Sequence, residues 1–246
     1  MNYLIAKTII KSKNDAEISV HHIDEYNDKH FKDVAEIFNK VGIEVKLDDD
    51  FIKKINSYYF LTIAFEGIMP VGIVTARKAE FIVESTIESQ IALLTGIVVI
   101  PEFQGSELAK ELVRLTDDAC SRKNLTDFWH FQACVNWRAY LLALTVMPSF
   151  VPQPGRTMTK LESEVMDAAG AHFYGSLYQD GLVAPPPGSL IAGCAEMRIP
   201  IDPAILAANI KARYFSEINP KYVDGFSLGM IRYHSSWDIK NDEFSN

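Results

Sequence analysis

The feature of this 246-residue chain that could do chemistry is an apolar strand that passes through a proline turn into a helix start. Residues 91–100 are mostly apolar, Pro101 follows, and the pair Gln104-Gly105 precedes a helical pattern. The first N–H groups of a helix have no partner inside the helix, and the helix dipole adds partial positive charge there. This arrangement can bind a phosphate without a side-chain cation. Gly105 would let the ligand approach the backbone closely.

The residues after this turn have the spacing of an amphipathic helix. Apolar residues recur at steps of four, three and four, which predicts one buried face made of Leu108, Leu112, Leu115 and Ala119. Arg122 and Lys123 place positive charge in the last turn, and Asn124 can end the helix.

The whole segment resembles the acyl-coenzyme A binding motif of GNAT-type N-acetyltransferases. In that family the motif reads Arg or Gln, two residues, Gly, one residue, then Gly or Ala, and its backbone amides hold the coenzyme A pyrophosphate. Gln104 and Ala109 match its ends, Gly105 matches a glycine that often follows the Gln, and Glu107 replaces the middle glycine. The resemblance implies a cofactor-binding segment of six consecutive residues: Gln104, Gly105, Ser106, Glu107, Leu108 and Ala109.

Glu107 leaves two interpretations open. A carboxylate in the first helical turn competes with a phosphate for the same N–H groups and repels it. Alternatively, it points into solvent and only favours the helix dipole. The alternative to the whole motif is an ordinary strand-turn-helix unit of another α/β protein.

A second stretch resembles the family's helix of the form Asn-x-x-Ala-x-x-Leu-Tyr, which packs beside the pantetheine arm. Asn136, Ala139 and Leu142 match it. Ala143 stands where the family has the Tyr that often protonates the departing thiolate. Tyr140 lies three residues earlier and could reach that space only if the helix were shifted or rotated. An equally good interpretation is that the Tyr140 ring packs in the core.

The resemblance implies transfer of an acyl group from acetyl-CoA, or from another acyl-CoA, to the amine of a small molecule or peptide. The amine must be neutral, the thioester carbonyl polarised, and the sulfur finally protonated. In the family, a backbone N–H of the strand before the phosphate turn polarises the carbonyl. Here this would be among Ile97, Val98 and Val99, with Gly96 as the expected position of a bulge.

Three residues are candidates for the general base. Glu84 and Glu88 precede the central strand and His130 lies on the next one, so each could face the cleft between the two strands. A histidine pKa near ~6.5 suits proton transfer at neutral pH. A lone histidine among aromatic residues is nevertheless more often a hydrogen-bonded core residue. Cys134 is a weaker candidate for a nucleophile, because a free cysteine in an apolar strand usually behaves as a small hydrophobe.

Periodicity predicts the elements that must position these residues. Their order is strand, two helices, three strands, helix, strand and helix, which is also the order of the GNAT core. The predicted ranges are 3–10, 31–41, 48–55, 58–65, 70–76, 91–100, 106–123, 126–135 and 136–144. The polar residues between the first strand and the first helix, including His21, His22 and His30, are interpreted as a solvated loop.

The resemblance ends at Met147. Beyond it we expect a helix at 159–174, a stiff proline loop at 185–187, a helix at 203–218 and a final strand at 226–233. The expected organisation is a GNAT-like acyl-CoA binding core at 1–147 and an extension at 148–246. The extension would complete the sheet and form a wall of the acceptor site. The core and the extension could also form one continuous domain. The expected fold class is α/β (α+β), with a mixed, mostly antiparallel central sheet flanked by helices.

Composition restricts the partners. The net charge of −8 and the lack of a basic cluster argue against nucleic acid. No apolar run reaches the ~18 residues of a membrane span, and no secretory signal is recognised. Three widely spaced cysteines suggest neither a disulfide framework nor a metal site, so we expect a cytoplasmic protein. Aromatic residues of the extension fit a pocket, core packing or a homodimer.

Two functions follow from these observations. The first is an acyl-CoA dependent N-acyltransferase. The second is a non-catalytic binding or regulatory module of the same fold that has lost turnover, and Glu107 and Ala143 are the residues that favour it.

Overall fold

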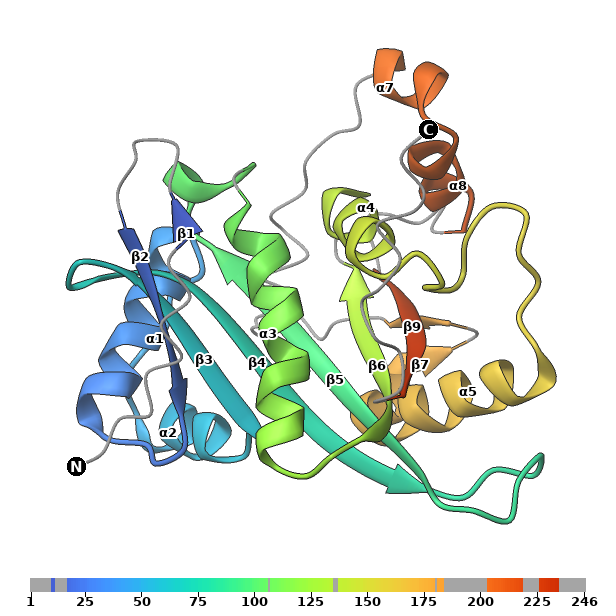
Figure 1. Ribbon diagram of the computed structural model, residues 1–246, viewed down its shortest axis with the longest axis horizontal. Coiled ribbons are helices and arrows are strands. Elements are labelled where there is room, and N and C mark those ends of the chain that lie inside the picture. The colour runs from blue at the N-terminus through green and yellow to red at the C-terminus, as the bar shows by residue number, and fades with distance from the viewer. Residues whose placement is uncertain are drawn as a thin grey trace.

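The computed structural model describes residues 10–11, 17–105, 107–134, 137–179, 181–183, 203–218 and 226–234. Within these ranges the chain forms one nine-stranded sheet with helices on both faces (Figure 1). The strand order is β1-β2-β3-β4-β5-β6-β9-β8-β7. The strands are β1 (Ile10–Lys11), β2 (Glu17–Ile23), β3 (Phe60–Glu66), β4 (Met69–Phe81), β5 (Gln90–Val99), β6 (Asp127–Cys134), β7 (Tyr178–Gln179), β8 (Leu182–Val183) and β9 (Phe226–His234).

Neighbouring strands are antiparallel except for β5 and β6, which are parallel. A parallel pair needs a long crossover, and α3 provides it here. The mixed, mostly antiparallel sheet confirms the expected fold class. The element order from β2 to α4 is the predicted one, except that β2 stands in the place of the strand predicted at 3–10, of which residues 3–9 lie outside the described residues.

Helices cover both faces of the sheet. They are α1 (Asp28–Lys40), α2 (Asp49–Asn56), α3 (Leu108–Arg122), α4 (Trp137–Val146), α5 (Lys160–Tyr174), α7 (Pro203–Ala208) and α8 (Ile210–Ile218), with short 3-10 turns η1 (Pro101–Phe103) and η2 (Gly175–Leu177). The helices α1 and α3 both pack on β4 and β5, and Figure 1 shows α3 in front of the sheet and α1 behind it. The four predicted apolar residues of α3 are all buried, which confirms its stripe.

The main difference from the predicted elements lies before α1. Residues 17–23 form β2, whereas the sequence was interpreted as a loop there. Ile18 and Val20 point into the core, and His22 takes the next inward position, where its Nδ1 lies 2.7 Å from Thr62 Oγ1. His30 is buried as well. A neighbouring hydroxyl thus pairs with one of the two ring nitrogens of His22. The alternation of inward and outward residues was not recognised in the sequence because this inward position is polar.

Two further elements differ from their predicted bounds. The strand β4 continues to Phe81, five residues beyond its predicted end at residue 76. The helix predicted at 203–218 is two helices, because Asn209 interrupts it and its Oδ1 accepts from the backbone N–H groups of Lys211 and Ala212. Asparagine favours such a cap over a helix interior. The proline loop predicted at 185–187 lies outside the described residues.

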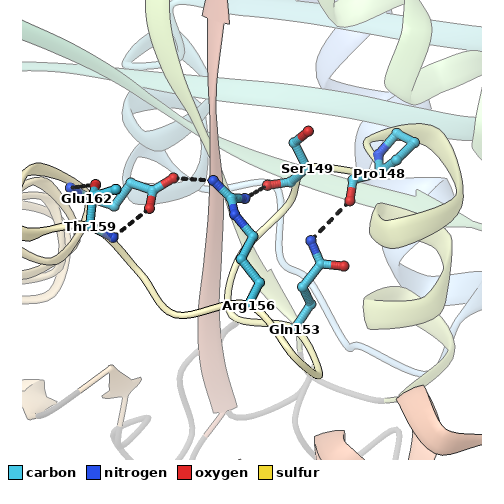
Figure 2. A network of polar contacts seen from close by, with 6 residues as sticks. All are labelled: Pro148, Ser149, Gln153, Arg156, Thr159 and Glu162. Atoms are coloured by element: carbon cyan, nitrogen blue, oxygen red, sulfur yellow. Dashed lines mark hydrogen bonds and ion pairs between the residues drawn. The ribbon is translucent and has the colours of Figure 1, made fainter. Parts of the chain in front are cut away.

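The connection from α4 to α5 is fixed by a polar network (Figure 2). Arg156 donates to the Ser149 carbonyl and to the Glu162 carboxylate. Glu162 also accepts from the Thr159 N–H while Thr159 Oγ1 accepts from the Glu162 N–H, which closes a capping box at the start of α5. One arginine therefore ties the loop to the helix that follows it.

The final predicted strand is present as β9. It pairs with β6 at eight positions, from Asp127 opposite His234 to Cys134 opposite Ser227. The other edge of β9 pairs with β8. Strands that lie far from β6 in the sequence therefore complete the sheet beside it.

Candidate functional site

The strands β5 and β6 form a fork. They pair over only four positions, from Ala92 opposite Trp129 to Thr95 opposite Gln132. On its other side β5 stays paired with β4 in unbroken register up to Val99. Within the part of the chain that the structure describes, residues 96–99 therefore have a strand neighbour on one side only, and we call the space on the other side the fork.

The register shows which backbone groups face the fork. The Ile100 N–H donates to the Val71 carbonyl of β4 at 3.1 Å, so residues of the same parity direct their backbone groups to β4. Ile97 and Val99 alternate with them and face the fork. The side chain of Gln104 donates to the Val99 carbonyl at 3.0 Å, which holds the following turn against this edge.

The expected bulge at Gly96 is not there, because the β4–β5 register has no shift. The open edge arises instead from the departure of β6. Gly96 is exposed and Ile97 is half-buried, so the edge is accessible. The region predicted to supply the backbone donor therefore does have an open edge. The cause is the departure of β6 from β5 and not a bulge.

The turn after β5 leads directly to the start of α3. The 3-10 turn η1 buries Phe103, Gln104 is extended, and Gly105 has φ 72°, a left-handed conformation that favours glycine. Glu107 is the N-cap residue of α3 and makes no side-chain capping bond. Ser106 lies outside the described residues. Among the described residues, no side chain caps the start of α3, which follows the open edge of β5 in the chain.

The Glu107 carboxylate points away from this helix start. Its side chain is 64% exposed, and one oxygen lies 2.8 Å from the ammonium of Lys110. The geometry fits the interpretation in which Glu107 faces solvent. Its charge is also partly offset by Lys110, although such exposed pairs contribute little to stability.

Tyr140 is packed in the core. Its hydroxyl donates to the Pro152 carbonyl at 2.8 Å, and its ring lies 5.4 Å from that of Phe215. Burial raises the pKa of this hydroxyl above its usual range. A proton already donated to a carbonyl is not available to a thiolate, so the structure favours the packing interpretation. Ala143 is buried and Asn136 lies outside the described residues.

His130 is also a hydrogen-bonded core residue. It is 2% exposed, and its Nε2 lies 2.6 Å from Thr95 Oγ1. Because Thr95 donates its single proton to the Phe131 carbonyl at 2.9 Å, the His130 Nε2 must be the donor in this pair. Burial lowers the pKa of His130 to about 4, so the ring is neutral at pH 7. Burial likewise raises the pKa of Cys134, which is an inert thiol.

Glu84 and Glu88 do not face the fork. Both are exposed in the β4–β5 connection, at the end of β5 opposite to the fork (Figure 1). Nine residues separate Glu88 from Ile97, which is roughly 30 Å in an extended strand. The sequence does not reveal where β6 leaves β5, so it could not exclude these carboxylates.

Two functional candidates were missed. Gln132 Oε1 and Trp137 Nε1 are buried, and neither has a hydrogen-bond partner among the described residues. Gln132 is the last residue of β6 that still has a partner on β5, and Trp137 begins α4. A glutamine inside an otherwise apolar strand was the signal in the sequence.

No three His, Cys, Asp or Glu side chains among the described residues are grouped as metal ligands. Within the same residues, every helix is too short or too polar to cross a bilayer.

No family model and no curated protein sequence matches the chain. Among solved structures, an aminoglycoside acetyltransferase from an uncultured soil metagenomic sample is 16% identical, covers 58% of this chain and 95% of its own, and has a TM-score of 0.44. The GNAT domain of S. lividans PAT is 10% identical, with 62% and 91% coverage and a TM-score of 0.45. The structure of yncA from Salmonella typhimurium, a candidate acetyltransferase with its cofactor acetyl-CoA, is 14% identical, with 58% and 87% coverage and a TM-score of 0.39.

Proposed function

We propose that the protein is an N-acyltransferase that moves an acetyl or other acyl group from acyl-coenzyme A to an amine of a small molecule or peptide. One observation carries this proposal: the open edge of β5 at Ile97 and Val99 is followed by the start of α3, where no described side chain caps the helix. A ligand with an anionic end and an extended, amide-containing arm fits such a surface. The proposal rests on this geometry and on the motif residues Gln104, Gly105 and Ala109.

The residues present fit acyl-coenzyme A as a co-substrate. The backbone at the start of α3 would hold the pyrophosphate, and Gly105 leaves room for it because it carries no side chain. The Ile97 N–H would donate to the thioester carbonyl oxygen. Such a donor acts on charge that develops in the transition state and typically contributes about 10²–10³ in rate.

The fork would align the two reactants. The amine nitrogen forms a bond to the carbonyl carbon, the carbon–sulfur bond breaks, the nitrogen loses one proton and the sulfur takes one. Among the described residues, the candidate acids and bases His130, Tyr140 and Glu88 are buried and bonded or lie far away. We therefore assign the proton transfers to water, and the chain's contribution to placement and to the backbone donor.

The second candidate function is a non-catalytic module that binds the same coenzyme. The observation that favours it is that Tyr140 donates to Pro152 and that Ala143 stands at the position of the family's acid. The two functions differ in one measurable property, which is release of free thiol in the presence of an amine.

The first experiment is the shift in melting temperature with coenzyme A and acetyl-coenzyme A, because a ligand that binds only the folded state stabilises it. We expect a saturable rise that Gly105→Glu abolishes. The control is Gly42→Glu, which has the same positive φ and gains the same charge at the end of α1. No rise at millimolar ligand would sink the proposal. A rise without thiol release over a panel of amines would favour the non-catalytic module.

A further inference from the structure

We propose that Gln132, assisted by Trp137, is a specificity subsite for a short acyl group that carries a hydroxyl or carboxamide. The subsite lies at the closed end of the fork, and this inference rests on the proposed acyltransferase function. It starts from two buried side chains, each with a polar atom that has no hydrogen-bond partner among the described residues.

Gln132 is 4% exposed and its Oε1 accepts no hydrogen bond from the described residues. Trp137 is 8% exposed and its indole N–H likewise has no acceptor there. Leaving a buried amide or N–H unpaired is unfavourable, and native proteins rarely retain such groups unless something else binds them. The two residues are five positions apart, across the point where β6 ends and α4 begins.

The same sheet contains a matched pair that is satisfied. Gln90 is 5% exposed and Trp129 is 3% exposed, and the Trp129 Nε1–H donates to Gln90 Oε1 at 2.9 Å. Gln90 also donates to the Glu88 carbonyl at 3.1 Å. At this position the fold therefore satisfies a buried glutamine and a buried tryptophan by pairing them with each other. The Oε1 of Gln132, at the last paired position of β6, and the Nε1 of Trp137, at the start of α4, have no such partner among the described residues.

The position of Gln132 selects the part of the ligand that meets it. A ligand arm that runs from the start of α3 passes Val99 and reaches Ile97 first. Gln132 lies opposite Thr95, two residues further along β5, which is roughly 7 Å beyond the Ile97 donor. The portion beyond the thioester carbonyl is the acyl substituent, so that portion and not the coenzyme arm reaches Gln132.

The chemistry of the two side chains defines the acyl group. A carboxamide both donates and accepts, and an indole N–H only donates. An acetyl methyl group satisfies neither, whereas a hydroxyl or carboxamide two to three carbons from the carbonyl can pair with both. We therefore assign the subsite to a neutral polar acyl group.

The test compares 3-hydroxybutyryl-coenzyme A with butyryl-coenzyme A, which differ by one hydroxyl, in calorimetric titrations of the full chain. We expect about tenfold tighter binding of the hydroxylated ligand, since one neutral hydrogen bond contributes that much. In Gln132→Met the preference should fall below about twofold, and Trp137→Phe, which keeps an aromatic ring, should lose part of it. Equal affinities for the two ligands in the unsubstituted protein would overturn the inference.

Stability of the ligand-free protein gives an independent readout. Gln132→Met should leave the melting temperature unchanged or raise it, because it removes a buried Oε1 that has no partner among the described residues. The control Gln90→Met should lower it by about 3 to 10 °C, because it removes the acceptor of the Trp129 Nε1–H hydrogen bond. An equal loss in both variants would show that Gln132 is structural. If neither these ligands nor acetyl-coenzyme A bind, the proposed function itself fails, whereas binding without preference refutes only the subsite.

Discussion

Glu107 places a negative charge at the N-cap of α3, where the proposed phosphate site lies. Its carboxylate turns toward Lys110, which reduces but does not remove the repulsion of an anion. We expect Glu107→Gln to tighten coenzyme A binding about two- to fivefold at low salt, as for other charges near a helix terminus. Titration calorimetry measures this effect.

The matched control is Glu111→Gln. Glu111 forms an ion pair with Arg114 at the same three-residue spacing, one turn further from the helix start. Glu111→Gln should change the free energy of coenzyme A binding by less than half as much as Glu107→Gln does. Equal effects of the two substitutions would place the anion elsewhere.

His130 makes folding stability depend on pH. The unfolded ring has a pKa near ~6.5 and burial lowers the folded value to about 4, so the unfolded state binds more protons between these values. The contribution is constant above pH ~6.5 and is lost as the pH falls toward about 4, by about 3 kcal/mol in total.

Chemical denaturation at a series of pH values measures this slope. His130→Gln should flatten the decline between pH ~6.5 and ~4, whatever its effect on stability at neutral pH. His172→Gln, a substitution at an exposed position of α5, should keep the full decline. An unchanged slope in His130→Gln would contradict the assignment.

At the scale of elements, the fork makes neighbouring residues of β5 respond differently to proline. The Ile97 N–H faces the fork, whereas the Val98 N–H lies in the ladder with β4. Ile97→Pro should therefore keep most of the stability but lower turnover of acetyl-coenzyme A by about 10²–10³.

Val98→Pro is the control, because it removes a ladder hydrogen bond and should lower the melting temperature markedly. Thermal unfolding and thiol release, measured on both variants, separate the two effects. Full turnover in a folded Ile97→Pro variant would exclude this N–H as the carbonyl donor.

The sequence predicted those elements whose period is set by apolar residues alone. The stripe of α3 and the final strand β9 are examples, and the position of the open edge at Ile97 to Val99 followed from the family resemblance. β2 was missed because His22 occupies an inward position with Thr62 as its partner.

The limits of the fork could not be predicted in the same way. The point at which β6 leaves β5 depends on tertiary packing, and so do the partners of His130 and Tyr140. Gln132 and Trp137 are recognisable only once their missing partners are seen. Sequence patterns report which faces are buried but not which buried polar groups are paired.

At the scale of the whole molecule, the described residues that follow Met147 are part of the central structure. They supply β9 to the edge of β6 and buried residues such as Phe150, Val165 and Phe215 to the core. We expect a fragment of residues 1–147 to lack cooperative thermal unfolding and to aggregate, because it exposes an apolar strand edge. Calorimetry and gel filtration beside the full chain test this. A monomeric fragment that unfolds cooperatively would show that the first part is an independent domain.

The position of β9 between β6 and β8 also determines the order in which parts of the sheet can form during synthesis in the cell. About ninety residues separate β6 from β9, so a ribosome needs roughly 5 to 20 s to deliver the neighbour of β6 after β6 itself has emerged. During that interval β1 to β5 can assemble, while one side of the fork remains unsupported. The proposed acyl site is therefore completed late in synthesis, after the proposed coenzyme-binding segment.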